Sequence, residues 1–147
     1  MAALHERLGG DETALALKRS GGGPRPDFIL REAELIVEVD EVQHFTSDRL
    51  LTLELYPKRM EIAFDIDEYR TLASKWSSVA DKYRAAKPAL DFPHPGGRRA
   101  QRAYFDAVRD LVAPSFGWTV CRIPAPECDP IIAFTRLTDR LARPLSR

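Results

Sequence analysis

Residues 25–44 contain two short apolar runs in which carboxylates are embedded, and this feature constrains the fold more than any other. The runs cover residues 28–30 and 35–39, are enriched in β-branched and aromatic residues, and are separated by a short polar segment. Such a pattern is typical of two adjacent antiparallel strands. With the turn centred on Glu32 and Ala33, Phe28 faces Val37 and Asp27 lies opposite Glu38. We therefore predict a β-hairpin over these residues.

Alternation along the hairpin separates its side chains into an apolar face and an acidic face. The apolar face is predicted to pack in the core and consists of Phe28, Leu30, Leu35, Val37 and Val39. The other face carries Asp27, Glu38 and Asp40, with His44 on the same side if the extended chain continues. Three carboxylates this close repel one another unless a cation lies among them. Oxygen ligands of this kind favour Mg²⁺ or Mn²⁺.

Length and composition indicate one soluble globular domain over residues 1–147. The chain has 44% hydrophobic and 30% charged residues, which is compatible with a single hydrophobic core. No apolar run is long enough for a transmembrane helix, and the first residues do not resemble a signal peptide, so the cytoplasm is the expected location. Two cysteines, Cys121 and Cys128, are too few for a disulfide framework.

The formal net charge is zero, but the charge is unevenly distributed along the chain. Residues 27–68 hold twelve acidic residues against four basic ones, whereas residues 98–147 hold nine arginines against five acidic residues. An acidic metal-binding cluster beside an arginine-rich surface suits a phosphodiester substrate. A solvated charged face explains the arginines about as well.

The remaining chain predicts helices and strands in alternation. We expect helices over residues 2–8, 47–56, 67–87, 97–112 and 129–141, and strands over residues 13–18 and 118–123. In the last helix Ile131, Phe134, Leu137 and Leu141 are expected to face inward. These elements predict a mixed α/β domain in which helices flank a small sheet.

Several motifs together resemble the PD-(D/E)XK, or restriction-endonuclease-like, nuclease superfamily. Pro26-Asp27 matches the first half of its motif, and Glu38-Val39-Asp40 stands at the second half. With Gln43-His44-Phe45 and the late strand 117–123, the chain is similar to a bacterial branch related to very-short-patch-repair endonucleases, which carries an E-V-D-x-x-x-H pattern. The resemblance implies a restriction-endonuclease-like mixed sheet flanked by helices and Mg²⁺-dependent hydrolysis of phosphodiester bonds.

The resemblance also implies roles for individual residues. Asp27 and Glu38 would be metal ligands, and Asp40 stands in place of the superfamily's lysine as a further ligand. The carbonyl group of Val39 could complete the coordination. His44 would act as a general base, or would hold the attacking water or a phosphate.

The chain departs from the superfamily at the motif lysine. The work of that lysine must fall to His44 or to a nearby basic residue, and the candidates for contact with the substrate phosphates are Lys58, Arg59, Arg98 and Arg102. In addition, Glu41 stands where related sequences often have glycine.

Three interpretations of function follow. The first is a metal-dependent nuclease that acts on DNA, with RNA as the less favoured substrate, and that could work as a homodimer. The second is a restriction-endonuclease-like domain that has lost catalysis and serves as a nucleic-acid-binding or assembly module, which the missing lysine supports. The third is a structural α/β protein with a solvated acidic hairpin and no affinity for metal.

Overall fold

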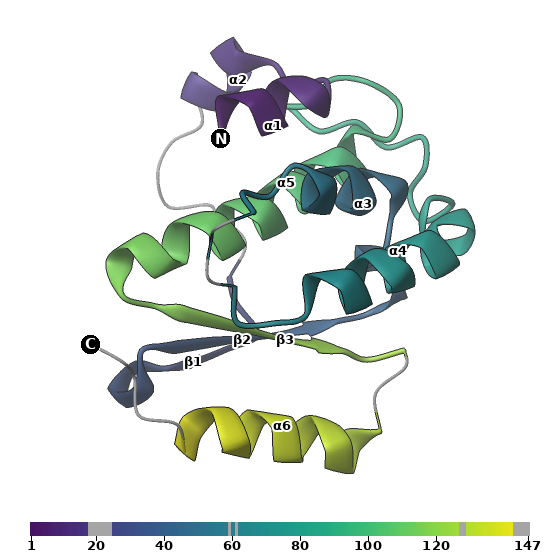
Figure 1. Ribbon diagram of the computed structural model, residues 1–147. Coiled ribbons are helices and arrows are strands. Elements are labelled where there is room, and N and C mark those ends of the chain that lie inside the picture. The colour runs from purple at the N-terminus through teal and green to yellow at the C-terminus, as the bar shows by residue number, and fades with distance from the viewer. Residues whose placement is uncertain (18–24, 59, 61, 127–128, 143–147) are drawn as a thin grey trace.

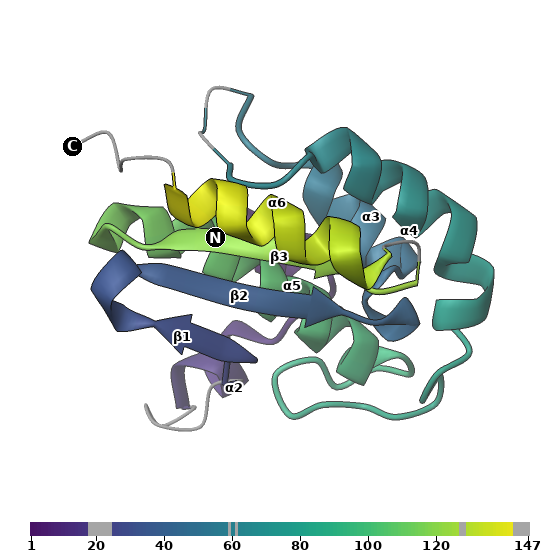
Figure 2. The ribbon, with the colours of Figure 1, turned by 90° about the horizontal axis from the view of Figure 1, so that it is seen from below.

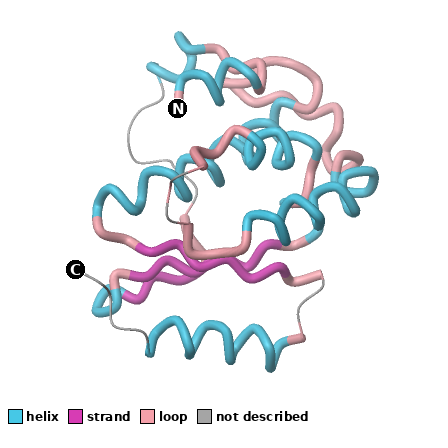
Figure 3. Tube along the Cα trace, in the orientation of Figure 1, coloured by secondary structure: helices cyan, strands magenta, loops and turns pink. Residues whose placement is uncertain are grey.

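The computed structural model describes residues 1–17, 25–58, 60, 62–126 and 129–142, without side chains for residues 140–142. Its helices and strands are, in chain order, α1 (Ala2–Arg7), α2 (Glu12–Leu17), β1 (Phe28–Leu30), η1 (Arg31–Ala33), β2 (Leu35–Asp40), η2 (Val42–His44), α3 (Ser47–Glu54), α4 (Ile66–Ala80), α5 (Gly97–Val112), η3 (Ala113–Phe116), β3 (Thr119–Pro124) and α6 (Pro130–Ala142). The strands form one layer between helices (Figure 3).

The sheet has three strands in the order β1-β2-β3, with β2 at the centre. β1 pairs with β2 in antiparallel fashion, and Phe28 lies opposite Val37 as the hairpin pattern predicts. The short helix η1 closes the hairpin, and Glu34 after it adopts a left-handed conformation with φ of 48°. β2 and β3 run parallel, so the helices α3, α4 and α5 form the connection between them.

The molecule has helices on both faces of the sheet. α6 covers one face, and α3, α4 and α5 lie over the other, with α1 and α2 beyond α5 (Figure 1). This arrangement confirms the prediction of a mixed α/β domain with a small sheet flanked by helices. In the described part of the chain, no helix is both long enough and apolar enough to cross a membrane.

Two separate apolar cores stabilise these layers. The smaller core lies between the sheet and α6 and contains Leu35, Val37 and Cys121, with Leu137 of α6 packed against them. The larger core consists of residues from the helices and the segments that join them, and its members are Leu4, Leu8, Phe45, Leu53, Tyr56, Tyr69, Leu72, Ala73, Phe92, Ala100, Tyr104 and Ala107. The face of the sheet that is covered by α3, α4 and α5 therefore contacts these helices mainly through side chains that belong to neither core.

Several side chains at the centre of this face are charged. Glu38 on β2 lies opposite Arg122 on β3 in the parallel pairing, and Asp40 follows two residues later on the same face. All three are buried, with 5%, 5% and 1% of their surface exposed for Glu38, Arg122 and Asp40. A polar layer thus separates the sheet from the helices above it, and the candidate site belongs to this layer.

Two predicted elements differ clearly from the observed ones. Residues 12–17 form a helix instead of a strand, because Asp11 caps it through a 3.0 Å hydrogen bond from the Ala14 N–H, and alanine and leucine favour helices. α4 begins after Asp65, whose side chain accepts hydrogen bonds from the N–H groups of Asp67 and Glu68, and it ends at Ala80, well before residue 87.

Some predicted core residues are exposed. Phe28 is 60% exposed because α6 lies along β3, on the far side of β2 from the short edge strand β1 (Figure 2). Ile131 and Phe134 on α6 are 76% and 68% exposed, since α6 contacts the sheet core through Leu137. Leu141 and Cys128 lie outside the residues whose side chains are described.

Candidate active site

A cavity of about 1010 Å³ opens between the acidic face of the hairpin, η2, α5 and the segment before α5. The acidic residues that line it are Asp27, Glu38, Glu41, Asp91 and Asp106, and the basic ones are Arg25, Arg84, Lys87, Arg98, Arg102 and Arg109. Val39 and His44 line it as well. The cavity therefore combines groups that bind cations with groups that bind anions.

Asp27 and Glu38 both line this cavity, as the hairpin register predicts. Oδ2 of Asp27 accepts a 2.8 Å hydrogen bond from the backbone N–H of Val39, the residue next to Glu38. This bond fixes the Asp27 carboxylate beside β2 although Asp27 itself precedes β1. The hairpin thus delivers two of the three predicted carboxylates to one place.

Glu38 is the carboxylate with the most unusual environment. Its Oε1 lies 2.5 Å from Nη1 of Arg109 but accepts no hydrogen bond within the described part of the chain. Burial raises the pKa of Glu38 to about 7, although the positive charges of Arg109 and Arg122 oppose this effect. Arg109 comes from α5 and is the arginine that forms an ion pair with Glu38.

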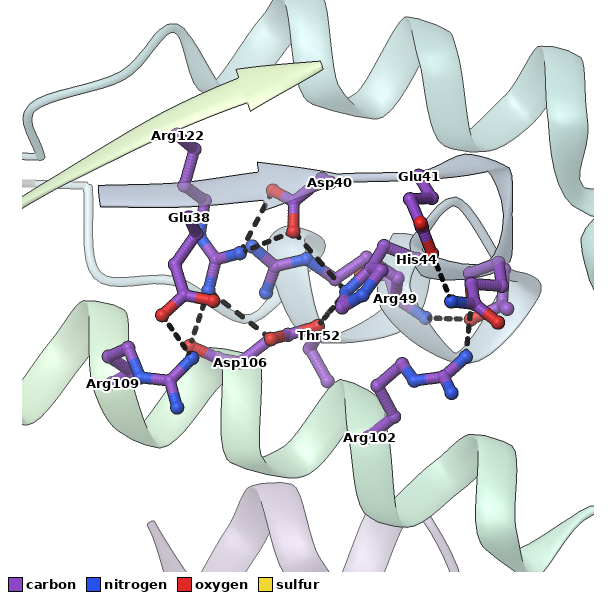
Figure 4. A network of polar contacts seen from close by, with 12 residues as sticks. Glu38, Asp40, Glu41, His44, Arg49, Thr52, Arg102, Asp106, Arg109 and Arg122 are labelled. Carbon is purple, nitrogen blue, oxygen red and sulfur yellow. Dashed lines mark hydrogen bonds and ion pairs between the residues drawn. The ribbon is translucent and has the colours of Figure 1, made fainter. Parts of the chain in front are cut away.

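Asp40 points to the same side of β2 but belongs to the buried network instead of the cavity (Figure 4). Both of its carboxylate oxygens lie 2.9 Å from Nη1 of Arg122, and the hydroxyl of Tyr69 donates a further 2.9 Å hydrogen bond to Oδ2. The structure therefore does not bring Asp27, Glu38 and Asp40 together around one point. The charge of Asp40 is already balanced by an arginine.

His44 lies where η2 turns away from β2, and its ring contacts two carboxylates. Nδ1 is 3.0 Å from Oδ2 of Asp106 and 3.3 Å from Oδ1 of Asp40. Burial lowers the pKa of His44, but the hydrogen bond and the negative charge of Asp106, together with Asp40, outweigh burial and raise it. Because a carboxylate can only accept, Nδ1 carries the proton in the neutral ring, and Nε2 keeps its lone pair.

Asp106 on α5 is a site residue that the sequence patterns do not single out. It is buried, and although burial raises its pKa, the charge of Arg122 and the hydrogen bond to His44 hold that pKa well below its usual range. One signal could have found it, because Arg98, Arg102, Asp106 and Arg109 recur at helical spacing along α5. This polar stripe faces the cavity, since all four residues line it.

Beneath the cavity, a network of buried charges joins α3, α5 and β3. Asp110 lies 2.7 Å from Arg49 and 2.7 Å from Arg122, and Tyr56 donates a 2.6 Å hydrogen bond to it. Arg122 links this network to Asp40 and Asp106. Each buried charge has an opposite charge in contact with it, so the network stabilises the arrangement of β2, β3 and α5.

The predicted phosphate-binding residues divide into two groups. Arg98 and Arg102 line the cavity, and Nη1 of Arg102 donates a 3.0 Å hydrogen bond to the carbonyl oxygen of Gln43. Gly97 allows the start of α5 to lie close to Phe92, because a Cβ at position 97 would overlap with the carbonyl group of Phe92. Lys58 is exposed and does not line the cavity, and Arg59 lies outside the described residues.

Two sets of side chains are candidates for a divalent cation. Ligand atoms of Asp40, His44 and Asp106 lie within 4.8 Å of one another, yet Arg122 already pairs with both of these carboxylates. Asp27 and Glu38 lie at the cavity wall, and the buried Oε1 of Glu38 accepts no hydrogen bond among the described residues. Glu38 also pairs with Arg109, but Asp27, Glu38 and Val39 all line the open cavity, so Asp27, Glu38 and the Val39 carbonyl are the set that a hard cation in the cavity could reach.

No known protein family, curated protein or solved structure matches the chain.

Proposed function

We propose that the chain is a metal-dependent nuclease that hydrolyses phosphodiester bonds in the cavity beside the hairpin. The observation that carries this proposal is that one cavity is lined by two adjacent carboxylates, a histidine held by Asp106 and a row of arginines on α5. These are the groups that phosphoryl transfer requires, because the reaction builds negative charge on the phosphate and needs proton transfer at the attacking oxygen. The preference for DNA follows from the family resemblance.

The arginines account for substrate binding. Arg98 and Arg102 stand one helical turn apart on α5 and could contact phosphate oxygens that approach His44. Arg109, one further turn beyond Asp106, provides positive charge next to Glu38 and takes the place that a motif lysine would otherwise occupy. Guanidinium groups suit this role because they bind phosphate through two parallel hydrogen bonds.

His44 supports the proton-transfer step. With its Nδ1 proton directed at Asp106, the neutral ring presents the basic Nε2, which can accept a proton from the attacking water. The raised pKa of His44 also favours a protonated ring, which can instead donate to the leaving oxygen. Asp106 orients the ring in both cases, in the manner of the carboxylate in a catalytic triad.

Asp27, Glu38 and the Val39 carbonyl would hold the cation. Bound Mg²⁺ or Mn²⁺ would polarise a phosphoryl oxygen and make water a stronger nucleophile. The carboxylates themselves keep anionic phosphate away from the β2 backbone unless such a cation is present. Metal dependence is therefore expected.

The test is cleavage of supercoiled plasmid and of single-stranded DNA with Mg²⁺ or Mn²⁺. We expect the native chain to cleave and Asp27→Ala and Glu38→Ala to lose cleavage. Glu32→Ala is the matched control, because Glu32 is an exposed carboxylate on the same hairpin that does not line the cavity. Equal activity in all four proteins would contradict the proposal.

One observation favours a second function, a nucleic-acid-binding module without catalysis. Arg109 already neutralises Glu38 at 2.5 Å, and the superfamily's lysine is absent. A binding module would retain affinity for nucleic acid in the presence of a chelator and would show no cleavage with either metal. Its Asp27→Ala variant would bind nucleic acid as well as the native chain does.

A further inference from the structure

We propose that the substrate strand enters this cavity unpaired, with one base stacked on Tyr83 and its neighbouring phosphates held by Arg84, Arg98 and Arg102. This inference rests on the proposed function and names the substrate class of the same site. It is carried by an exposed aromatic ring that lies beside two arginines of the cavity lining.

Tyr83 follows the end of α4 and lies next to two arginines that line the cavity, although it does not line the cavity itself. Its side chain is 44% exposed. The guanidinium groups of Arg84 and Arg102 lie 5.2 Å and 5.7 Å from the centre of its ring, and both arginines line the cavity. Exposed aromatic rings beside arginines are how many proteins bind unpaired bases, because every base has a face that can stack.

Arg84 adopts a backbone conformation that its side chain does not favour. Its φ is 53°, in the left-handed region, where glycine is the preferred residue after a helix. An arginine at this position costs conformational energy, and the cost is understandable if the guanidinium group has a function at the cavity. Strained residues of this kind concentrate at functional sites.

The three arginines lie close enough to affect one another. Burial lowers the pKa of Arg102, and the positive charges of Arg98 and Arg84 lower it further, while Asp106 and Tyr83 oppose them. An anion among these three guanidinium groups would relieve their mutual repulsion. Arg102 also bonds to the carbonyl oxygen of Gln43, so a phosphate held there lies next to His44.

The depth of the site favours an unpaired strand over a duplex. The side chain of Glu38 is only 6% exposed, so a scissile phosphate must enter the cavity to reach it. In a duplex the phosphates lie outside and the bases are turned inward, which prevents a paired nucleotide from reaching Glu38 and Tyr83 together. The cavity volume of about 1010 Å³ is at the upper end of small-molecule sites and suits a few nucleotides.

The experiment measures binding without metal, so that it is independent of cleavage. Fluorescein-labelled oligo(dT), oligo(U) and a blunt DNA duplex are titrated with the full chain in a chelator, and anisotropy is recorded. We expect at least one single strand to bind about tenfold more tightly than the duplex. Comparison of oligo(dT) with oligo(U) shows whether the site binds a deoxyribose or a ribose strand more tightly.

Four variants test the roles of Tyr83 and Arg84. Tyr83→Ala should weaken single-strand binding about tenfold, and Tyr83→Phe should retain it, because stacking needs the ring and not the hydroxyl. Arg84→Gly should weaken binding while leaving the melting temperature unchanged or higher, since glycine accepts the left-handed conformation. Phe116→Ala is the control, because Phe116 is 74% exposed and does not line the cavity.

Tighter binding of the duplex, or an unchanged affinity of both Tyr83→Ala and Arg84→Gly, would overturn the inference. Cleavage of plasmid by a protein with those properties would leave the proposed nuclease function intact. Tight, Tyr83-dependent binding of single strands without any cleavage would support the inference and contradict the nuclease function. The two proposals therefore fail in different experiments.

Discussion

Both carboxylate oxygens of Asp40 lie 2.9 Å from Nη1 of Arg122, which stands 82 residues later in the chain. The two side chains are 1% and 0% exposed, and they join the central strand to its parallel neighbour. Asp40 thereby differs from Asp27 and Glu38, which line the open cavity. A pattern that looks like three equivalent metal ligands therefore contains one residue, Asp40, that is fully buried in an ion pair away from the cavity.

Asp40→Asn should therefore destabilise the fold more than it affects metal binding. Removing its charge leaves part of the buried Arg122 charge unbalanced, and the expected loss is about 3 kcal/mol in the free energy of unfolding. Urea denaturation in the presence of a chelator measures this loss. Asp67→Asn is the control, because Asp67 is 86% exposed in its ion pair with Arg70 and should change stability by less than about 0.5 kcal/mol. Unchanged stability together with a lost response to Mg²⁺ would instead make Asp40 a metal ligand.

The second prediction concerns the pH dependence that Glu38 imposes. Its pKa is raised from 4.5 to about 7, so the native state binds more protons than the unfolded state between these values. Stability therefore falls as the pH rises through this interval, and the destabilisation is complete above pH 7. The glutamine side chain of Glu38→Gln has no titratable group, so this variant lacks the pH dependence that Glu38 imposes. The stability of the variant relative to the native chain should increase by about 2 kcal/mol from pH 5 to pH 8, after allowance for solvent screening on the cavity side.

Melting temperatures at a series of pH values, in a chelator, measure this difference. The matched control is Glu32→Gln, which changes an exposed carboxylate on the same hairpin and should follow the native curve at every pH. A constant difference between Glu38→Gln and the native chain from pH 5 to pH 8 would show that Glu38 titrates normally.

The third prediction concerns His44 and Asp106. In Asp106→Asn the pKa of His44 should fall, because the hydrogen bond to a charged carboxylate and its Coulomb attraction both raise that pKa in the native chain. NMR titration of the ring nitrogens measures the change. His94 is an internal control, since its two ring nitrogens hydrogen-bond to the backbone carbonyl groups of Pro95 and Leu8 and not to Asp106.

A raised pKa of His44 also has a consequence for stability. The stabilisation is complete below the unfolded-state value of 6.5 and is lost as the pH rises through the higher native value. Asp106→Asn should therefore cost more stability at acidic than at alkaline pH. If the cost in stability is the same at every pH, Asp106 stabilises the fold through its ion pair with Arg122 and not through His44.

The fourth prediction is that Mg²⁺ or Mn²⁺ stabilises the native chain through Asp27. A ligand at one hundred times its dissociation constant adds about 2.7 kcal/mol to the free energy of unfolding. Asp27→Asn should abolish this gain, while its amide oxygen can still accept the hydrogen bond from the Val39 N–H. Differential scanning fluorimetry with and without metal measures it. A full metal response in Asp27→Asn would place the cation elsewhere.

The fifth prediction concerns His5 on α1, which is 1% exposed and packs edge-on against Phe92 and Tyr104. Neither of its ring nitrogens has a hydrogen-bond partner among the described residues. Because unpaired buried polar atoms are costly, His5→Leu should increase the free energy of unfolding by about 1 kcal/mol. Urea denaturation measures this gain, and a loss of stability would mean that the ring packs better than a leucine can.

Features that depend on neighbouring residues could be predicted from the sequence. The hairpin register is confirmed at Phe28 and Val37, and the helix predicted over residues 97–112 is observed as α5 with the same bounds. The error at residues 13–18 arose because a short apolar run does not distinguish a strand from a helix, and the alanine and leucine residues of this run favour the helix.

Burial and charge pairing could not be predicted in this way. The partners of Asp40, Glu38 and His44 are Arg122, Arg109 and Asp106, which come from α5 and β3, far along the chain. Whether a carboxylate needs a metal depends on which cations the folded chain brings against it. The sequence by itself determined that acidic side chains share one face of a hairpin. Only the tertiary structure decided that arginines pair with Asp40 and Glu38 and that Asp27 and Glu38 line a cavity, because those contacts form when helices pack on the sheet.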